Sequence, residues 1–179
     1  MQITVETLVR AEPAAVWSAW TTPADIVQWN AASDDWQTTA ATRDLREGGA
    51  FTSRMEARDG SAGFDFAGTY TEVVPERRLA FRMGDARTVE VDFAPEGNGT
   101  RVRETFDADD GPFTVEQQRQ GWQAILDRFA RHVEAQVDAP QHKRFGARCN
   151  NRAWDLADKP ERTSDEDREL LDTAHAASW

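Results

Sequence analysis

The sequence predicts an α+β domain in which a curved antiparallel β-sheet of about six or seven strands wraps around one long α-helix, followed by a helical C-terminal tail. Apolar and polar residues alternate almost throughout residues 36–106, and this period of two indicates β-strands. Turn signals separate the alternating runs at short intervals, as in an antiparallel meander. After residue 112 the period becomes helical, and only this helix is long enough to cover one face of the sheet.

Residues 1–30 predict one strand and then two short helices. Residues 3–9 alternate apolar and polar side chains, which is typical of a half-buried strand. Pro13 suits the first turn of a helix, and Pro23 ends that helix and begins the next one. The apolar side chains of the two helices are Val16, Trp17, Trp20, Ile26, Val27 and Trp29.

The remaining strands are expected within residues 36–106. Their large apolar side chains recur at alternate positions, so one face of the sheet should be buried. Arg101 and Arg103 fall on the opposite face, where we expect cross-strand ion pairs with Glu90 and Asp92. The turns between the strands are expected at Asp59-Gly60, Pro75-Glu76, Gly84-Asp85 and Gly97-Asn98-Gly99.

A long helix is predicted from about Thr114 to Val137. Thr114 stands three residues before Gln117, the spacing of a capping box. One apolar stripe then follows the helical period. Residues 1–137 are therefore expected to form one domain, and the members of the stripe are Trp122, Ile125, Leu126, Phe129 and Val133.

A strongly curved sheet around a single helix has a concave interior, which either packs solid or leaves a pocket. Ligand pockets are usually apolar with a few convergent polar groups. Two of the inward residues are polar: Tyr70 brings a hydroxyl, and Glu104 lies between Val102 and Phe106 on one strand face. The predicted ligand-binding residues are Trp29, Trp36, Phe51, Met55, Phe66, Tyr70, Phe81, Met83, Phe93, Glu104 and Trp122.

Glu104 has two interpretations, since an unpaired buried carboxylate is costly. It is either a polar handle or general acid in the pocket, with a raised pKa, or it lies at the rim and meets water or an arginine. For each ring of the set, ordinary core packing is the alternative.

Composition limits the classes of partner. The 179 residues carry a formal net charge of −11, which disfavours nucleic acid and anionic membranes as partners. The single cysteine, Cys149, excludes an intrachain disulfide and fits a reducing cytoplasm. The N-terminus lacks the layout of a signal peptide, and no apolar run is long enough to span a bilayer. No phosphate loop or metal-ligand spacing is present, so no cofactor or metal is expected.

Residues 138–179 predict a linker and a two-helix extension. The helices are expected at about residues 145–157 and after Thr163, where Thr163 and Glu166 form a second capping box. Two helices alone bury too little surface to be stable. We therefore expect the extension to dock on its own domain, to pair with a second copy, or to be a remnant; the first two contacts would use Trp154 and Leu171.

Residues 1–137 resemble the SRPBCC superfamily of helix-grip domains, and within it the family named after the activator of the ninety-kilodalton heat-shock protein's ATPase. The resemblance implies the helix-grip fold; members include ligand carriers, aromatase/cyclase-like enzymes and co-chaperone domains. At Glu104 the family is more often apolar. The tail, at Asn150–Leu156 and Ala174–Ala177, resembles the start of a helical domain of uncharacterised bacterial proteins. The segments that carry the main resemblance are Ala11–Trp17, Trp20–Pro23, Trp29, Asp44–Gly49, Gly68–Leu79, Phe81, Gly99-Thr100 and Gly121-Trp122.

The sequence leads to three hypotheses about function. The first, which we favour, is binding of a small hydrophobic or aromatic molecule without catalysis. The second is a cyclase, hydratase or hydrolase that uses Glu104 and Tyr70 as acid and base. The third is a co-chaperone-like interaction module, which needs an exposed apolar patch.

Overall fold

A computed structural model describes residues 1–157, 159 and 163–177, with side chains described for residues 1–138, 156, 157, 159 and 163–172. The chain divides into two compact units, Met1–Glu134 and Ala135–Trp179. The predicted boundary between residues 137 and 138 stays a prediction.

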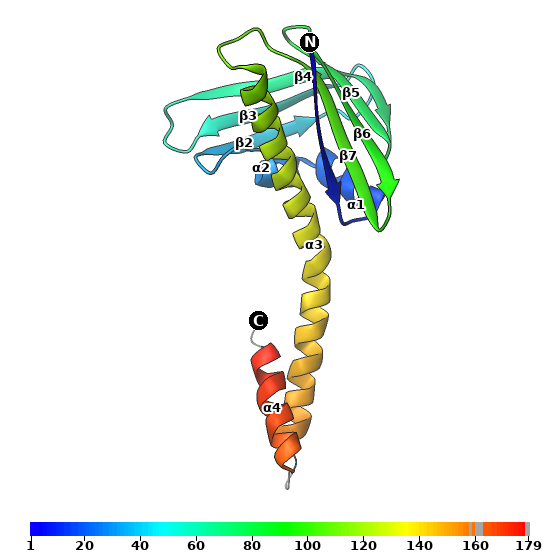
Figure 1. Cartoon of the computed structure of the whole chain (residues 1–179), viewed down its shortest axis with the longest axis vertical. Helices are drawn as coiled ribbons and strands as arrows, with labels where there is room; N and C mark the ends of the chain where they lie inside the picture. Colours follow the sequence, from blue (N-terminus) through cyan, green and yellow to red (C-terminus); the bar gives the residue numbers. More distant parts are fainter. Residues whose placement is uncertain (158, 160–162, 178–179) are drawn as a thin grey trace. The chain divides into compact units, whose positions relative to one another are not determined.

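The first unit contains the predicted curved sheet, with seven strands in the order β1-β7-β6-β5-β4-β3-β2. Every neighbouring pair is antiparallel. Figure 1 shows the sheet curling around the first half of α3, as the sequence predicted. The strands are β1 (Gln2–Val9), β2 (Trp36–Arg43), β3 (Ala50–Ala57), β4 (Gly63–Val74), β5 (Arg78–Met83), β6 (Thr88–Glu96) and β7 (Gly99–Asp107).

The helices begin where their sequence signals stand. The short helices α1 (Pro13–Thr21) and α2 (Pro23–Trp29) each begin at a proline. The long helix α3 (Val115–Ala157) begins after the predicted capping box. There Gln117 N–H donates to Thr114 Oγ1 at 3.2 Å, and Thr114 N–H donates to Gln117 Oε1 at 2.9 Å. Two backbone donors at the start of α3 are thus satisfied within one turn.

The apolar stripe of α3 divides into two parts. Leu126, Phe129 and Val133 are almost fully buried. The Phe129 ring lies edge-on against Trp20 and Trp29, at centroid distances of 4.8 and 5.0 Å. These contacts hold the helix on α1 and α2 and fill one end of the domain.

The other part of the stripe, Trp122 and Ile125, is only half-buried. The Trp122 ring stacks on Phe106 of β7 at 3.9 Å with an interplanar angle of 13°. This stack joins the helix to β7, the strand next to the edge strand β1. Trp122 and Ile125 also border open space in the interior of the domain, which explains why neither side chain is fully buried.

Polar contacts also attach α3 to the N-terminal elements. The His132 Nε2 atom lies 2.8 Å from Asp25 Oδ1 of α2. Glu134 forms an ion pair with Arg10 at 3.0 Å, directly after β1. These contacts orient α3 but are partly exposed, so the buried rings supply more of the stability.

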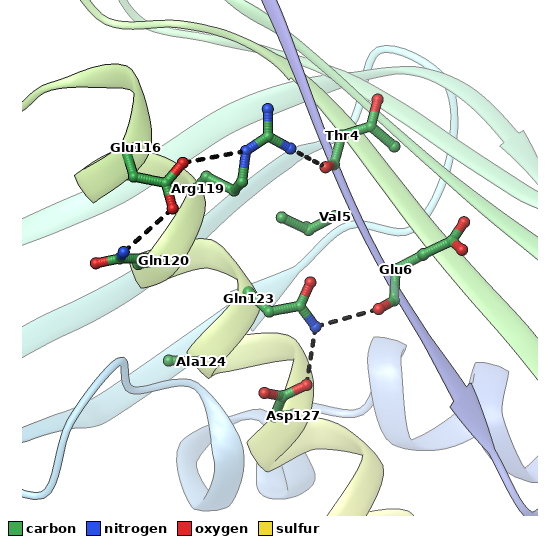
Figure 2. Close-up of a pocket in the computed structure, with 9 residues that line it drawn as sticks. All are labelled: Thr4, Val5, Glu6, Glu116, Arg119, Gln120, Gln123, Ala124 and Asp127. Atoms are coloured by element: carbon green, nitrogen blue, oxygen red, sulfur yellow. Dashed lines mark hydrogen bonds and ion pairs between the residues drawn. The ribbon is translucent and has the colours of Figure 1, made fainter.

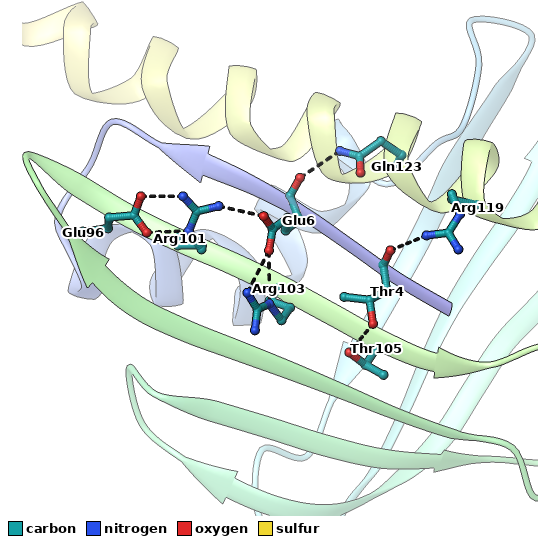
Figure 3. A network of polar contacts seen from close by, with 8 residues as sticks. All are labelled: Thr4, Glu6, Glu96, Arg101, Arg103, Thr105, Arg119 and Gln123. Atoms are coloured by element: carbon teal, nitrogen blue, oxygen red, sulfur yellow. Dashed lines mark hydrogen bonds and ion pairs between the residues drawn. The ribbon is translucent and has the colours of Figure 1, made fainter. Parts of the chain in front are cut away.

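The outer-face ion pairs differ from the expected ones. Figure 3 shows Arg101 and Arg103 bound to Glu6 of β1, and Arg101 also to Glu96. The predicted partners Glu90 and Asp92 instead bind Arg78 of β5. The physical reason is strand order. β7 has a second neighbour, β1, on which Glu6 lies directly opposite Arg103, and β6 has a second neighbour, β5, on which Arg78 lies directly opposite Asp92.

The second unit holds the end of α3 and the helix α4 (Ser164–Ala177). The predicted capping box is present, with Glu166 N–H donating to Thr163 Oγ1 at 3.3 Å. The backbone is helical through residues 138–143, where a linker was expected. One proline removes one hydrogen bond and can bend a helix without ending it.

The predicted docking or dimer contact of the tail stays a prediction. The side chains of Trp154 and Cys149 lie outside the described residues, and Leu171 is 62% exposed. None of the helices that the structure describes is both long and apolar enough to cross a membrane.

The packing of α3 predicts a contrast between two leucines. Leu126 is fully buried, so Leu126→Ala should lower the free energy of unfolding by about 2–5 kcal/mol. Leu8 on β1 is 45% exposed, so Leu8→Ala should cost less than about 1 kcal/mol. Urea denaturation measures both values, and similar losses would contradict the position of α3 on the sheet.

Candidate functional site

A cavity of about 690 Å³ lies between the concave face of the sheet and the first turns of α3. Every predicted ligand-binding residue except Phe93 borders it. Phe93 packs edge-on against Trp17 and Trp20, at 5.5 and 5.7 Å, and is not among the residues that line the cavity. Alternation correctly placed Phe93 inside, but α1 covers its position on β6.

Aromatic rings form the floor of the cavity. Phe51 lies at their centre, with Phe81 edge-on at 4.8 Å, Tyr70 at 5.2 Å and Phe66 at 5.8 Å. Offset and edge-on contacts of this kind are the favourable arrangements of aromatic pairs. The rings therefore hold one another in place and leave a preformed apolar surface.

The absence of a side chain at Gly68 on β4 leaves space for the Phe51 ring. A Cβ atom at Gly68 would lie 2.8 Å from the nearest Phe51 ring carbon and 2.6 Å from the backbone oxygen of Arg82. The glycine inside this strand thus permits a close approach of ring and backbone.

Glu104 is the buried acidic group of the cavity. Its neighbours across the sheet are Val5 on β1 and Val91 on β6, both nearly fully buried, and Glu104 itself is 6% exposed. Burial raises the pKa of its carboxyl group to about 8, so this group holds its proton at neutral pH. The predicted alternative of a rim carboxylate paired with an arginine does not describe this geometry.

The Glu104 carboxyl group has no hydrogen-bond partner in the described part of the chain. No side-chain oxygen or nitrogen there is both fully enclosed and unpartnered. The carboxyl oxygens therefore retain contact with the cavity, where a bound molecule can accept or donate a hydrogen bond.

Tyr70 and Arg43 form a second polar group. Burial raises the pKa of the Tyr70 hydroxyl, and the nearby positive charge of Arg43 opposes this rise. Burial in turn lowers the pKa of the Arg43 guanidinium. Since arginine keeps its proton in proteins, Arg43 places one positive charge on the cavity wall.

Sequence reasoning missed Arg43 because of an irregularity in β2. Counting by two from Trp36 puts Arg43 on the outer face. The register of β2 shifts between Thr38 and Ala40, as in a β-bulge, and beyond it Ala41 and Arg43 are the less exposed residues. A bulge inserts one residue and reverses the facing of the residues after it. The small residues Thr38–Thr42 of this strand contain no signal of the shift.

The cavity opens beside two exposed rings. Phe64 is 48% exposed and Phe113 is 64% exposed, and both border the cavity. Gln118 of α3 holds the neighbouring loop, because its side-chain amide bonds the backbone of Asp109 at 2.8 and 2.9 Å and of Phe113 at 3.0 Å. The mouth of the cavity is thus bordered by Phe64 of β4 and by the loop with Phe113, which Gln118 attaches to the start of α3.

A second hollow, of about 410 Å³, lies between β1 and α3 (Figure 2). Arg119 donates to the Thr4 carbonyl oxygen at 2.7 Å, and Gln123 donates to the Glu6 carbonyl oxygen at 3.1 Å. These side chains occupy backbone acceptors of an edge strand and so protect the edge from pairing. We interpret this hollow as an edge cap.

In the described part of the chain, no group of three or more His, Cys, Asp or Glu side chains is placed to hold a metal ion.

Burial of Glu104 predicts a pH dependence of stability. The unfolded chain releases this proton near pH 4.5 and the folded protein near pH 8, so the folded state binds more protons in between. Stability from this group is therefore complete below about pH 4.5 and is lost as the pH rises to about 8. At pH 8.5, Glu104→Gln should be more stable than the unchanged protein by up to a few kcal/mol.

Urea denaturation at pH 5 and at pH 8.5 measures this effect. Glu47→Gln removes a carboxyl group at an exposed position and serves as the matched control. If the difference between Glu104→Gln and the unchanged protein were the same at both pH values, the carboxyl group would not be buried.

The comparisons with known proteins agree on one family. The family model described as activator of Hsp90 ATPase homolog 1-like protein matches residues 10–134. The solution structure of an AHSA1-like protein from Aeromonas hydrophila is 52% identical, covers 76% of this chain and 94% of that chain, and has a TM-score of 0.72. No curated protein matches the chain.

Two further solved structures are similar. A protein from Cytophaga hutchinsonii is 40% identical over 76% of this chain and 94% of that chain, with a TM-score of 0.66. A protein from Nitrosomonas europaea, 19% identical over 76% of this chain and 96% of that chain with a TM-score of 0.65, shows the fold alone. The resemblance found in the sequence is confirmed: the chain belongs to the family of activator of Hsp90 ATPase homolog 1-like proteins.

Proposed function

We propose that this protein binds a small hydrophobic or aromatic molecule in the cavity between the sheet and α3. The supporting observation is the cavity itself, which is bordered mainly by apolar residues, many of them aromatic, and has about 690 Å³ of space. This volume lies within the range of about 300–1,000 Å³ that is usual for small-molecule sites. The family's fold is one that accommodates ligands in general, which agrees with this assignment.

Acid–base catalysis on such a molecule is the second candidate. A buried carboxylic acid that keeps its proton at neutral pH is suited to donate it, and Glu104 is such an acid. Tyr70 is also buried and borders the same cavity. Turnover of a bound molecule that is lost in Glu104→Gln, while binding persists, would favour this candidate over simple binding.

An interaction module similar to a co-chaperone domain is the third candidate. It needs a continuous exposed apolar patch. In the described part of the chain, the two exposed phenylalanines, Phe64 and Phe113, border the cavity. They are therefore better explained as the mouth of a ligand site. A cavity that takes up no apolar probe would favour this third candidate.

Gly121 on α3 offers a direct test of the cavity. It borders the cavity, and a Cβ atom at this position would meet no atom within 4 Å. Gly121→Trp should therefore place a ring in the cavity without disturbing the backbone. The neutral fluorophore N-phenyl-1-naphthylamine should bind the unchanged protein, and Gly121→Trp should weaken this binding about fivefold or more, because one indole replaces a large share of the apolar contact area.

Gly121→Ala is the matched control. Alanine improves helix propensity by about 1 kcal/mol, as tryptophan also does in part, but leaves the cavity open. It should bind the fluorophore like the unchanged protein. Fluorescence titration measures all three affinities, and an unchanged protein that does not bind the fluorophore would refute the proposed function.

A further inference from the structure

We propose that the molecule bound in the cavity is an aromatic anion whose carboxylate is held by Arg43 and Tyr70. This inference rests on the proposed function and adds the chemical class of the ligand. It stands on an arginine without a carboxylate partner and a hydroxyl without a hydrogen-bond partner, among the residues described, in a wall that is otherwise mainly apolar.

The Arg43 guanidinium is oriented by neutral groups alone. Its Nη1 atom donates to the backbone oxygens of Thr42 at 2.8 Å and Thr52 at 3.1 Å. Its Nη2 atom donates to Ser53 Oγ at 2.9 Å, and its central carbon lies 5.0 Å from the centroid of the Phe51 ring. These contacts fix the plane of the side chain but neutralise none of its charge.

Two donors of Arg43 remain available. A guanidinium carries five N–H groups, and the three hydrogen bonds leave the Nε–H and one Nη2–H without an acceptor in the described part of the chain. No carboxylate there pairs with Arg43 either, although many other arginines of the domain do have one. A carboxylate ligand matches the remaining donors in both charge and geometry.

Tyr70 supplies a further donor at the same place. Arg43 and Tyr70 both lie against the Phe51 ring, with the guanidinium carbon 5.0 Å and the Tyr70 ring 5.2 Å from its centroid, and both side chains border the cavity. Tyr70 is 4% exposed, and its hydroxyl has no hydrogen-bond partner among the residues described. A ligand oxygen that approaches Arg43 can therefore accept from Tyr70 as well.

Glu104 does not neutralise Arg43. Burial alone raises the pKa of the Glu104 carboxyl group, without a contribution from any arginine. The neutral acid therefore adds no negative charge to the cavity at neutral pH. Arg87 and Asp109 also border the cavity, but they pair with each other at 3.6 Å, so Arg43 is the lining cation without a carboxylate partner among the residues described. The net charge of −11 repels anions only at long range, and physiological salt screens it beyond about 8 Å.

Two fluorophores with one scaffold test this inference. The anion 8-anilinonaphthalene-1-sulfonate carries a sulfonate in place of the carboxylate, and N-phenyl-1-naphthylamine is the same scaffold without charge. In Arg43→Gln, affinity for the anion should fall about tenfold or more, because hydrogen bonds to a charged group are lost. Affinity for the neutral fluorophore should change less than about twofold, which also shows that the variant is folded and its cavity intact.

Arg82→Gln removes the same charge from an exposed position on β5 and should change neither affinity. Arg43→Lys keeps the charge and should retain part of the binding of the anion. Two results would overturn the inference while the proposed function stands. One is an equal loss of affinity for both fluorophores in Arg43→Gln, and the other is an affinity for the anion that does not depend on Arg43. Failure of both fluorophores to bind the unchanged protein would overturn the proposed function itself.

Discussion

The ring contacts of α3 are the interaction on which the rest of the structure depends. Phe129 is packed between Trp20 and Trp29, and Trp122 stacks on Phe106 of β7. These contacts fasten the helix to α1 and α2 and to β7 of the sheet. The first turns of the helix border the cavity, whereas Leu126, Phe129 and Val133 of the later turns are almost fully buried. The same apolar stripe thus makes a solid core and one wall of a cavity.

The distribution of charge follows from this arrangement. On the outer face, Arg78, Arg101 and Arg103 each form ion pairs with carboxylates. Many of the positive charges on this solvent-facing side are therefore neutralised by nearby negative charges. Inside, Glu104 avoids the cost of a buried charge by keeping its proton. Arg43 cannot become neutral, because arginine is charged in its protonated form and keeps its proton in proteins. The interior is therefore mainly apolar, with a neutral acid and a cation at separate places.

Ten of the residues that line the cavity were predicted from the sequence, and Phe93 and Arg43 show two local causes of error. Phe93 was placed inside correctly, yet it packs under α1 and does not line the cavity, because a period of two says which face a side chain is on but not what covers it. Arg43 was missed because a shift of one residue in β2 reverses the face of the residues after it. Such a shift depends on pairing with β3, and a strand read by itself does not contain it.

The sequence by itself determined the order of the elements, the capping boxes at Thr114 and Thr163, and the inward face of most strands, because all of these depend on residues close together in the chain. The tertiary structure alone decided that β1 pairs with β7, that Glu6 therefore binds Arg101 and Arg103, and that Glu104 lies buried between two valines. It also decided that the rings leave space instead of filling it. These outcomes depend on the curvature of the sheet and on contacts between residues far apart in the chain, which local periodicity does not encode.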